Sequence, residues 1–309
     1  MKARVHTRPA FTLIELIVVI SIIALLAAIS ISAVFRLQET SRESNTNKTL
    51  LKVQMGLDPQ VKAARDTIAK ETPSDWVKTW TSSRDSNNNL VPDPIRAKAL
   101  HMKLRMRQEF PQTYAEARAL LGDPMYGSKL MYRNAIGAGS STPDLEAAAL
   151  LVVALSQNRG GITFSVEEIG RTEVRDIGGK QMRVILDEYG TPICLRRWAT
   201  DGELNSLPAD ELNQQPFVSP SQIASGNKDP DDPEGRFRNP APRQWDASYK
   251  TQAELLFTSV LPTVADPLPD FPVVSRNRGP YVVSAGKDKL FVTEDDLFSF
   301  RIQGSGKGN

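Results

Sequence analysis

The pattern of apolar and polar residues separates an apolar beginning of the chain from a mixed remainder. Positions 16–35 carry no charged residue, and the basic residues Lys2, Arg4 and Arg8 precede them. About 20 apolar residues in a helix are enough to cross the roughly 30 Å of hydrocarbon in a bilayer. The pattern predicts a membrane-spanning helix, with the basic leader on the cytoplasmic side and everything after Arg36 exported.

A single acid lies at the entrance of this apolar run. Glu15 is the only charged residue between Phe11 and Phe35. The favourable insertion of the many Leu, Ile, Val and Phe residues outweighs a penalty of about 3 kcal/mol for one acid near the edge of the membrane. An ionised acid in a membrane segment is tolerated when it is paired, and such acids are functional candidates. Glu15 is therefore a candidate functional residue.

Residues 11–15, Phe-Thr-Leu-Ile-Glu, follow a short basic leader. This arrangement resembles the class III signal of type IV pilins and of the pseudopilins of type II secretion. The resemblance implies cleavage by prepilin peptidase between Ala10 and Phe11, methylation of the new Phe11 amine, and a role for Glu15 in assembly. Glu15 would pair with the Phe11 amine of its own chain or of a neighbouring subunit. Ala10 stands where the family usually has Gly, but it is also small.

The alternative is an ordinary signal peptide, with small residues at a cleavage site near Ser30 to Ala33, or a plain membrane anchor. The apolar region of a secretory signal is usually about 7 to 15 residues long. The run in this chain is longer, and it has Glu15 at its entrance. These two features favour the class III signal.

Composition and short motifs exclude several kinds of site. The net charge of +2 indicates no particular partner, and the single cysteine, Cys194, excludes an internal disulfide. Cys194 is expected to be a small buried side chain. His6 and His101 cannot build a zinc site with one thiol. Residues 304–307 lack the spacing of a phosphate loop and residues 137–140 lack that of a nucleophile elbow, so we do not expect an enzyme.

Residues 36–71 are predicted to form the exported half of the N-terminal helix. Apolar residues recur there at steps of three and four, which predicts one buried helix face. These residues are Leu50, Val53, Leu57, Val61, Ala64 and Ile68. Gly56 to Pro59 interrupts the stripe, and Asp58 with Pro59 has the form of a new helix start. We therefore expect a break or kink at this point.

Residues 72–161 are predicted to be a helical insertion. Trp76 and Trp80 lie one helical turn apart, apolar residues form a second stripe over residues 95–110, and Leu145 to Leu155 is an alanine-rich apolar helix. Ser82 to Pro94 is predicted to be a loop that ends in a helix cap formed by Asp93 and Pro94.

The helix over residues 95–110 carries a set of basic residues beside His101. They are Arg96, Lys98, Lys103, Arg105 and Arg107. On the outer face of the helix they would offer a surface for phosphate backbones of nucleic acid or for anionic lipid. A solvated basic face that binds nothing is the alternative.

Residues 162–309 are predicted to form a pilin-type β domain. Residues 181–186 and 193–198 are expected to pair as a hairpin around the turn at 187–192. This turn is similar to the Asp-x-Trp-Gly-x-Pro turn of major pseudopilins, with Tyr189 in place of Trp. Residues 201–245 contain seven of the 21 prolines and are predicted to form a long loop. Short terminal strands are expected at Tyr281–Ser284, Leu290–Val292 and Leu297–Ile302.

Residues 284–288 and 293–296 resemble the C-terminal calcium loop of major pseudopilins. The resemblance implies a calcium site, which acidic oxygen ligands suit. Its side-chain ligands would be Asp288, Asp295 and Asp296. Lys289 and Val292 stand where the family usually has Gly. A solvated acidic turn between strands is the alternative.

Together these features predict an α+β, pilin-like fold with a long N-terminal transmembrane helix, a helical insertion and a small C-terminal antiparallel sheet. The predicted parts are a leader (1–10), a transmembrane half-helix (11–35), an exported half-helix (36–71), the insertion (72–161) and the β domain (162–309). The resemblance implies a structural subunit of a type II secretion pseudopilus or a type IV pilus-like filament. The subunit would first wait in the inner membrane as a single-pass protein.

The expected partners are copies of the chain itself, other pilins or pseudopilins, prepilin peptidase, membrane lipid and the inner-membrane assembly platform. One alternative is a minor pilin that binds DNA, a surface or a secreted cargo. The other is a membrane-anchored periplasmic domain.

Overall fold

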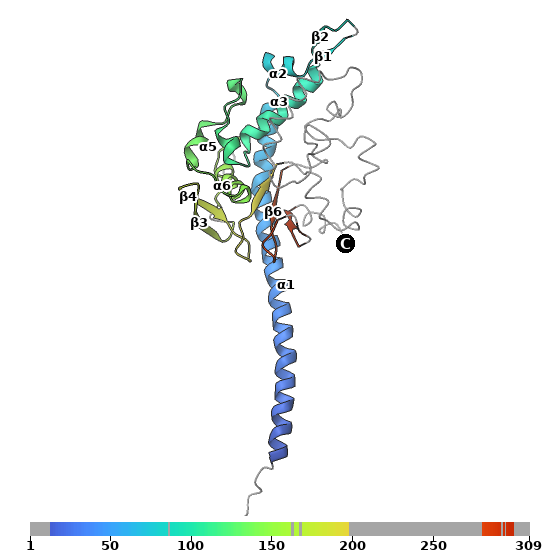
Figure 1. The fold of residues 1–309 in the computed structure, drawn as a ribbon, viewed down its shortest axis with the longest axis vertical. Coiled ribbons are helices and arrows are strands. Elements are labelled where there is room, and N and C mark those ends of the chain that lie inside the picture. Colours follow the sequence, from blue (N-terminus) through green and yellow to red (C-terminus); the bar gives the residue numbers. More distant parts are fainter. Residues whose placement is uncertain are drawn as a thin grey trace, which may run out of the picture. The chain divides into compact units, whose positions relative to one another are not determined.

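The computed structural model describes residues 13–85, 87–161, 164–166, 169–197, 280–291, 293 and 295–299. The predicted leader, with Ala10 and Phe11, and the predicted loop 201–245 lie outside the described residues. The chain divides into two compact units, Met1–Ser44 and Asn45–Asn309. The first helix, α1, extends from Leu13 to Ile68 (Figure 1).

The described elements mix helices with small antiparallel sheets, as an α+β fold requires. After α1 the helical elements are α2 (Asp75–Trp80), α3 (Pro94–Glu109), α4 (Tyr114–Arg118), the 3₁₀ helix η1 (Pro124–Tyr126), α5 (Leu130–Ala135) and α6 (Pro143–Leu155). The strands are β1 (Ser83–Arg84), β2 (Leu90–Val91), β3 (Thr172–Ile177), β4 (Lys180–Ile185), β5 (Cys194–Arg196), β6 (Tyr281–Ser284) and β7 (Leu297–Phe298). They form the antiparallel sheets β1-β2, β3-β4 and β5-β6-β7.

The apolar stripe of α1 is buried as the sequence predicts. Its six members, Leu50, Val53, Leu57, Val61, Ala64 and Ile68, are at most 6 % exposed. Of the predicted break or kink, the break is wrong, because α1 continues through Pro59; the kink stays a prediction. Asp58 caps no new helix; instead its Oδ1 accepts a hydrogen bond from Nε2 of Gln54, one turn earlier, at 2.5 Å. Gly56 allows the ring of Phe164 to approach, since an added Cβ would lie 2.7 Å from the ring.

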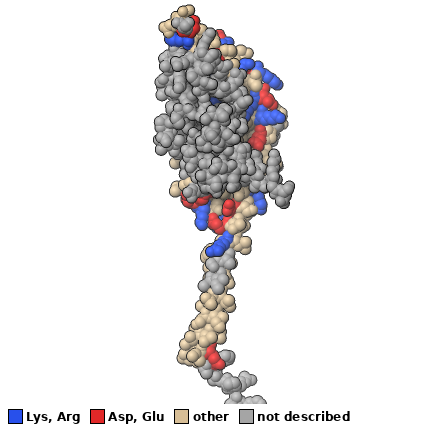
Figure 2. All heavy atoms as spheres, turned by 90° about the vertical axis from the view of Figure 1, so that its right-hand side faces the viewer, with Lys and Arg blue, Asp and Glu red and all other residues tan. Residues whose placement is uncertain are grey.

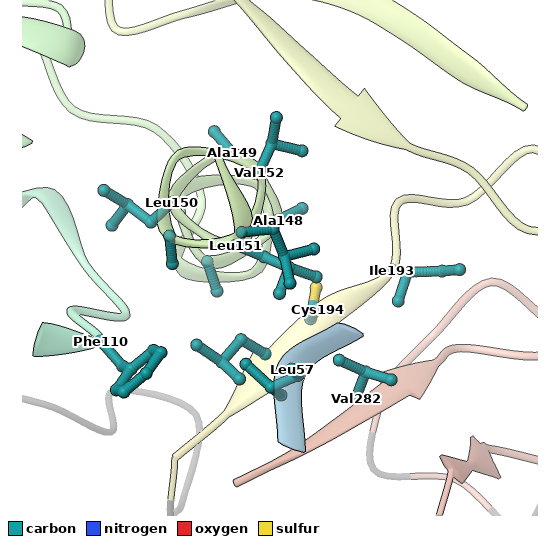
Figure 3. Packing of buried hydrophobic residues seen from close by; sticks show 14 of the residues in the cluster. Leu57, Phe110, Ala148, Ala149, Leu150, Leu151, Val152, Ile193, Cys194 and Val282 are labelled. Atoms are coloured by element: carbon teal, nitrogen blue, oxygen red, sulfur yellow. The ribbon is translucent and has the colours of Figure 1, made fainter. Parts of the chain in front are cut away.

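The core of this unit lies between α1, α6 and the three-stranded sheet. Figure 3 shows α6 above β5, with Cys194 pointing toward the helix and Leu57 of α1 beside Val282 of β6. Cys194 is fully buried, as predicted, and its Sγ donates to the carbonyl of Asp144 at 3.0 Å. The amide of Gln54 donates to the carbonyl of Pro280 at 3.0 Å and accepts from the Ser299 hydroxyl at 2.7 Å. One α1 side chain therefore holds the residue before β6 and the residue after β7.

The predicted hairpin of residues 181–186 with 193–198 does not form as a ladder. Its turn does close, since Ile193 N donates to the carbonyl of Ile185 at 2.9 Å. Beyond the turn the strands separate: β4 pairs with β3, and β5 pairs with β6. β4 pairs with β3 because Gly178 and Gly179 lie between them. Their φ angles of 62° and 80° suit the two-residue turn that joins β3 to β4.

Three further predictions have mixed outcomes. The helix cap at α3 is confirmed, because Asp93 Oδ1 accepts from the amides of Ile95 and Arg96 at 3.1 and 3.0 Å. The loop before it contains the short hairpin β1-β2, which the sequence did not predict.

Among the terminal strands, β6 matches its predicted bounds and β7 is short. The described part of the strand expected at residues 290–292 is not a strand, since the Leu290 amide bonds the Asp288 carboxylate instead.

Candidate functional site

The described apolar side chains at the beginning of α1 are exposed. Large apolar residues from Leu13 to Leu37 are 47 to 76 % exposed, and they follow one another closely enough to face every side of the helix. Figure 2 shows uncharged surface along this part of α1, with acidic atoms near its beginning. We call this segment the apolar stretch. A helix that is apolar all round normally lies inside a protein or a membrane, and an exposed apolar patch of this kind marks an interaction site.

Two hydroxyl groups in the apolar stretch are satisfied within the helix. Ser21 Oγ donates to the carbonyl of Ile17, and Ser30 Oγ donates to the carbonyl of Leu26, both at 2.8 Å. Such bonds to the carbonyl four residues earlier are the usual way for a serine inside a helix to satisfy its hydroxyl. These two serines therefore add little to the cost of moving the stretch from water into apolar surroundings.

Glu15 is exposed and lies in the first turn of α1. Backbone amide groups without helical partners collect at that end of a helix and favour a negative charge. Glu15 lies at such an end, close to the place where the processed chain would begin. Ala10 and Phe11 lie outside the described residues, so the pairing of Glu15 with the Phe11 amine stays a prediction.

No helix among the described residues meets the length and hydropathy required to cross a membrane. Positions 28, 29, 32 and 33 of the predicted span are not among the residues whose side chains are described. The predicted span over residues 16–35 is therefore not confirmed.

The predicted basic outer face of α3 is wrong. Arg96, Lys103 and Arg107 are at most 7 % exposed, and His101 is 3 % exposed. Only Lys98 of the set is exposed. The reason is that acids elsewhere in the chain pair with these bases inside the fold. Arg105 forms two hydrogen bonds of 2.8 Å to the carboxylate of Glu71, for example. The helix therefore does not present the predicted set of bases together on one outer face.

A buried carboxylate holds two arginines near the end of α3. Arg197 donates to Glu116 Oε1 at 2.7 Å and Oε2 at 3.1 Å, and Arg107 Nε lies 3.3 Å from Oε1. Burial alone would raise the pKa of Glu116, but Arg197, Arg107 and the amide of Gln112 keep it below its ordinary value. Sequence reasoning missed this cluster, and charged residues within otherwise apolar elements were the only available signal. Its full burial indicates a role in the fold.

The acids of the predicted calcium loop form hydrogen bonds within the loop. Asp295 Oδ2 accepts from the amides of Lys287 and Asp288 at 2.8 and 2.9 Å, and Asp288 Oδ1 accepts from the amide of Leu290 at 2.8 Å. The main-chain donors lower the pKa of Asp295 in spite of its partial burial, which raises it. The described residues contain no cluster of three or more acids, histidines or cysteines that could hold a metal. Calcium binding stays a prediction.

Comparison with known proteins gives one match. The family model of the prokaryotic N-terminal methylation motif matches residues 7–31. No curated protein and no solved structure matches the chain. The matched residues contain the Phe-Thr-Leu-Ile-Glu sequence and most of the apolar stretch. Residues 7–31 therefore carry the class III signal of type IV pilin-like proteins.

Proposed function

We propose that this chain is a structural subunit of a type II secretion pseudopilus or a type IV pilus-like filament. Prepilin peptidase cuts it between Ala10 and Phe11, and the subunit assembles through α1. The methylation motif at residues 7–31 supports the processing step. The single observation that carries the assembly step is the apolar stretch, which is exposed over Leu13 to Leu37.

The energetics of the apolar stretch favour a partner. Full burial of one large apolar side chain contributes about 1.5 to 3 kcal/mol, and the stretch exposes a long series of such side chains to water. The membrane receives this segment before assembly, and the α1 helices of other subunits cover it afterwards. The absence of charge between residues 16 and 35 supports both environments.

Glu15 then has a defined role in assembly. In apolar surroundings its carboxylate needs a cation, and the Phe11 amine created by the peptidase is four residues away in sequence. Removing one partner of a buried ion pair costs about 3 to 5 kcal/mol. Assembly that pairs Glu15 with an amine, in its own chain or in a neighbour, is therefore favoured over arrangements that leave either charge alone.

Intact-mass analysis and N-terminal sequencing of the protein from host membranes test the processing step. We expect a chain that begins at methylated Phe11. The assembly step is tested with Glu15→Ala, which should remain in the membrane fraction but be absent from sheared filaments. Asp66→Ala, which removes an exposed acid further along the same helix, is the matched control and should assemble normally. A chain that begins at Met1 or after Ser30 to Ala33, or normal assembly of Glu15→Ala, contradicts the proposal.

A specialised minor pilin that binds a surface or a secreted cargo is the second form of this proposal. The observation that favours it is the extent of the insertion, in which α2 to α6 occupy residues 75–155. Deletion of the gene for such a subunit would abolish adhesion or secretion while filaments of the major subunit persist. The DNA-binding form of this alternative is less well supported, because three of the five basic residues of α3, Arg96, Lys103 and Arg107, are buried.

A further inference from the structure

Helix α1 carries two pairs of like charges, each spaced by four residues. The acidic pair is Glu39 and Glu43, and the basic pair is Lys48 and Lys52. Residues four apart share one side of a helix, and two like charges at that spacing destabilise it. Glu43, Lys48 and Lys52 are exposed and Glu39 is half-buried. The basic pair therefore has a like-charge repulsion that an opposite charge from outside the helix would relieve.

The local sequence does not supply that opposite charge to the basic pair. No Asp or Glu stands three or four residues from Lys48 or Lys52. Among the described residues, Lys48 donates from its Nζ to the amide oxygen of Asn45 at 3.3 Å. Lys62 differs, because acids stand four residues to either side of it. The acidic pair also differs, because Arg36 and Arg42 stand three residues to either side of Glu39.

The two pairs match each other in spacing. Glu39 precedes Lys48 by nine residues, and Glu43 precedes Lys52 by nine residues. Nine residues of α-helix rise about 13.5 Å and make about two and a half turns. In a continuous helix, which α1 is, this half-turn puts one pair on the side opposite the other. Two parallel copies of α1 offset by nine residues therefore bring both acids level with both lysines.

We infer that neighbouring subunits of the filament pack with their α1 helices parallel and offset by nine residues, with Glu39 and Glu43 of one copy against Lys48 and Lys52 of the next. This inference rests on the proposed function. The occupant of the basic side is a second copy of this chain, because the charges are complementary and equally spaced. The contact joins two different surfaces of identical subunits, and such a head-to-tail contact repeats into an open filament.

A neighbour that is offset by nine residues cannot also provide the amine that pairs with Glu15. The Phe11 amine is four residues from Glu15, so a neighbour offset by nine residues does not place its amine level with that carboxylate. Subunits in a helical filament have more than one kind of neighbour. The Glu15 pairing therefore lies within one chain or involves a different neighbour from the one that provides the lysines.

Charge exchange tests the contact in assembled filaments. The double variants Glu39→Lys/Glu43→Lys and Lys48→Glu/Lys52→Glu place like charges opposite each other, and each should lose most of its filament yield. The variant that combines all four substitutions restores opposite charges and should recover the yield. The control is Lys62→Glu/Lys70→Glu, which changes the net charge by the same amount as the lysine variant. Both residues are exposed, Lys62 in α1 and Lys70 just after it, and this control should assemble normally.

Cross-linking gives a second readout that does not depend on yield. Filaments of Glu43→Cys/Lys52→Cys should form disulfide-linked ladders of subunits upon oxidation. Filaments of Glu43→Cys/Lys62→Cys should not, and the wild type controls for the buried Cys194. Normal assembly of either double charge variant, failure of the combined variant while its melting temperature is unchanged, or equal ladders in both cysteine variants overturns the nine-residue offset. Absence of filaments in the wild type would instead overturn the proposed function.

Discussion

Arg159 and Glu109 form an ion pair inside the fold, with Nε of the arginine 3.2 Å from Oε2 of the glutamate and both side chains 9 % exposed. The same guanidinium donates to Gln60 Oε1 at 2.6 Å, to the carbonyls of Ala154 and Glu109 at 2.6 and 2.9 Å, and to the hydroxyl of Tyr132 at 3.1 Å. These partners belong to α1, α3, α5 and α6. A single side chain therefore fixes four helices relative to one another.

The first prediction concerns the loss of this arginine. Arg159→Met keeps much of the volume but removes every donor, so the Glu109 carboxylate and two carbonyls lose a partner away from water. In the wild-type protein burial alone would raise the pKa of Glu109, but Lys129 and Arg159 hold this pKa below its ordinary value. We expect Arg159→Met to lower the free energy of unfolding by about 3 to 5 kcal/mol, measured by urea denaturation of the processed protein in detergent.

Arg133→Met is the matched control for that experiment. Arg133 is exposed on α5, and a surface substitution of this kind usually changes stability by less than about 0.5 kcal/mol. Equal stability of the two variants would show that the hydrogen bonds of Arg159 do not hold the helices together.

The second prediction concerns Gly56. Alanine stabilises the interior of a helix relative to glycine by up to about 1 kcal/mol, so propensity alone predicts a gain from Gly56→Ala. The new Cβ would lie 2.7 Å from Cδ2 and Cε2 of the Phe164 ring and 2.8 Å from its Cγ, and that overlap requires the ring to move. We expect Gly56→Ala to lower the melting temperature, and Phe164→Leu to reduce that loss when the two are combined. Gly122→Ala should change little, because its nearest contact would be an ordinary 3.5 Å.

Local sequence patterns were enough to predict the elements that depend on nearby residues. The buried stripe from Leu50 to Ile68, the cap at Asp93 and the strand β6 each follow from side-chain periodicity or from a residue that bonds its own helix end. The methylation motif is local as well, and its match covers residues 7–31.

Other features depend on partners that are distant in sequence. The strand β5 pairs with β6, whose residues follow more than 80 positions later, and alternation of side chains does not reveal such a partner. The prediction of a basic outer face on α3 was wrong for the same reason, since Arg105 pairs with Glu71 and Arg107 with Glu116. The β3-β4 hairpin could have been predicted from the sequence, because two adjacent glycines at positions 178 and 179 are a strong turn signal.

The third prediction tests the calcium loop. A ligand that binds only the folded protein raises its melting temperature in proportion to the logarithm of ligand concentration. If Asp288, Asp295 and Asp296 act as ligands, millimolar calcium should raise the melting temperature of the processed protein, and a chelator should reverse the rise. Asp288→Asn should weaken the response, and magnesium should not replace calcium, because it requires a more regular and tighter shell. An unchanged melting temperature at millimolar calcium would exclude the site.

The last prediction concerns pH. The ring of His101 is 3 % exposed, with Nδ1 2.9 Å from the Tyr126 hydroxyl and Nε2 3.4 Å from Glu71 Oε2. Burial lowers the pKa of His101, and this effect exceeds the opposing influence of the Glu71 charge, while Arg105 lowers the pKa further. The contact with Glu71 therefore involves a neutral ring near pH 7. In the unfolded chain the same histidine titrates near pH 6.5.

The sign of the pH dependence follows from this difference. Above about pH 6.5 the histidine is mostly neutral in both states and its contribution to stability is fully present. As the pH falls below that value, the unfolded chain binds a proton that the folded chain does not, so the free energy of unfolding decreases by up to about 1.4 kcal/mol per pH unit. The proposed cleavage before Phe11 would remove His6 and leave His101 as the one histidine of the two in the sequence. Urea midpoints at pH 7.5, 6.5 and 5.5 should therefore decline in the wild type and stay flatter in His101→Gln, whereas parallel declines would assign the effect to other groups.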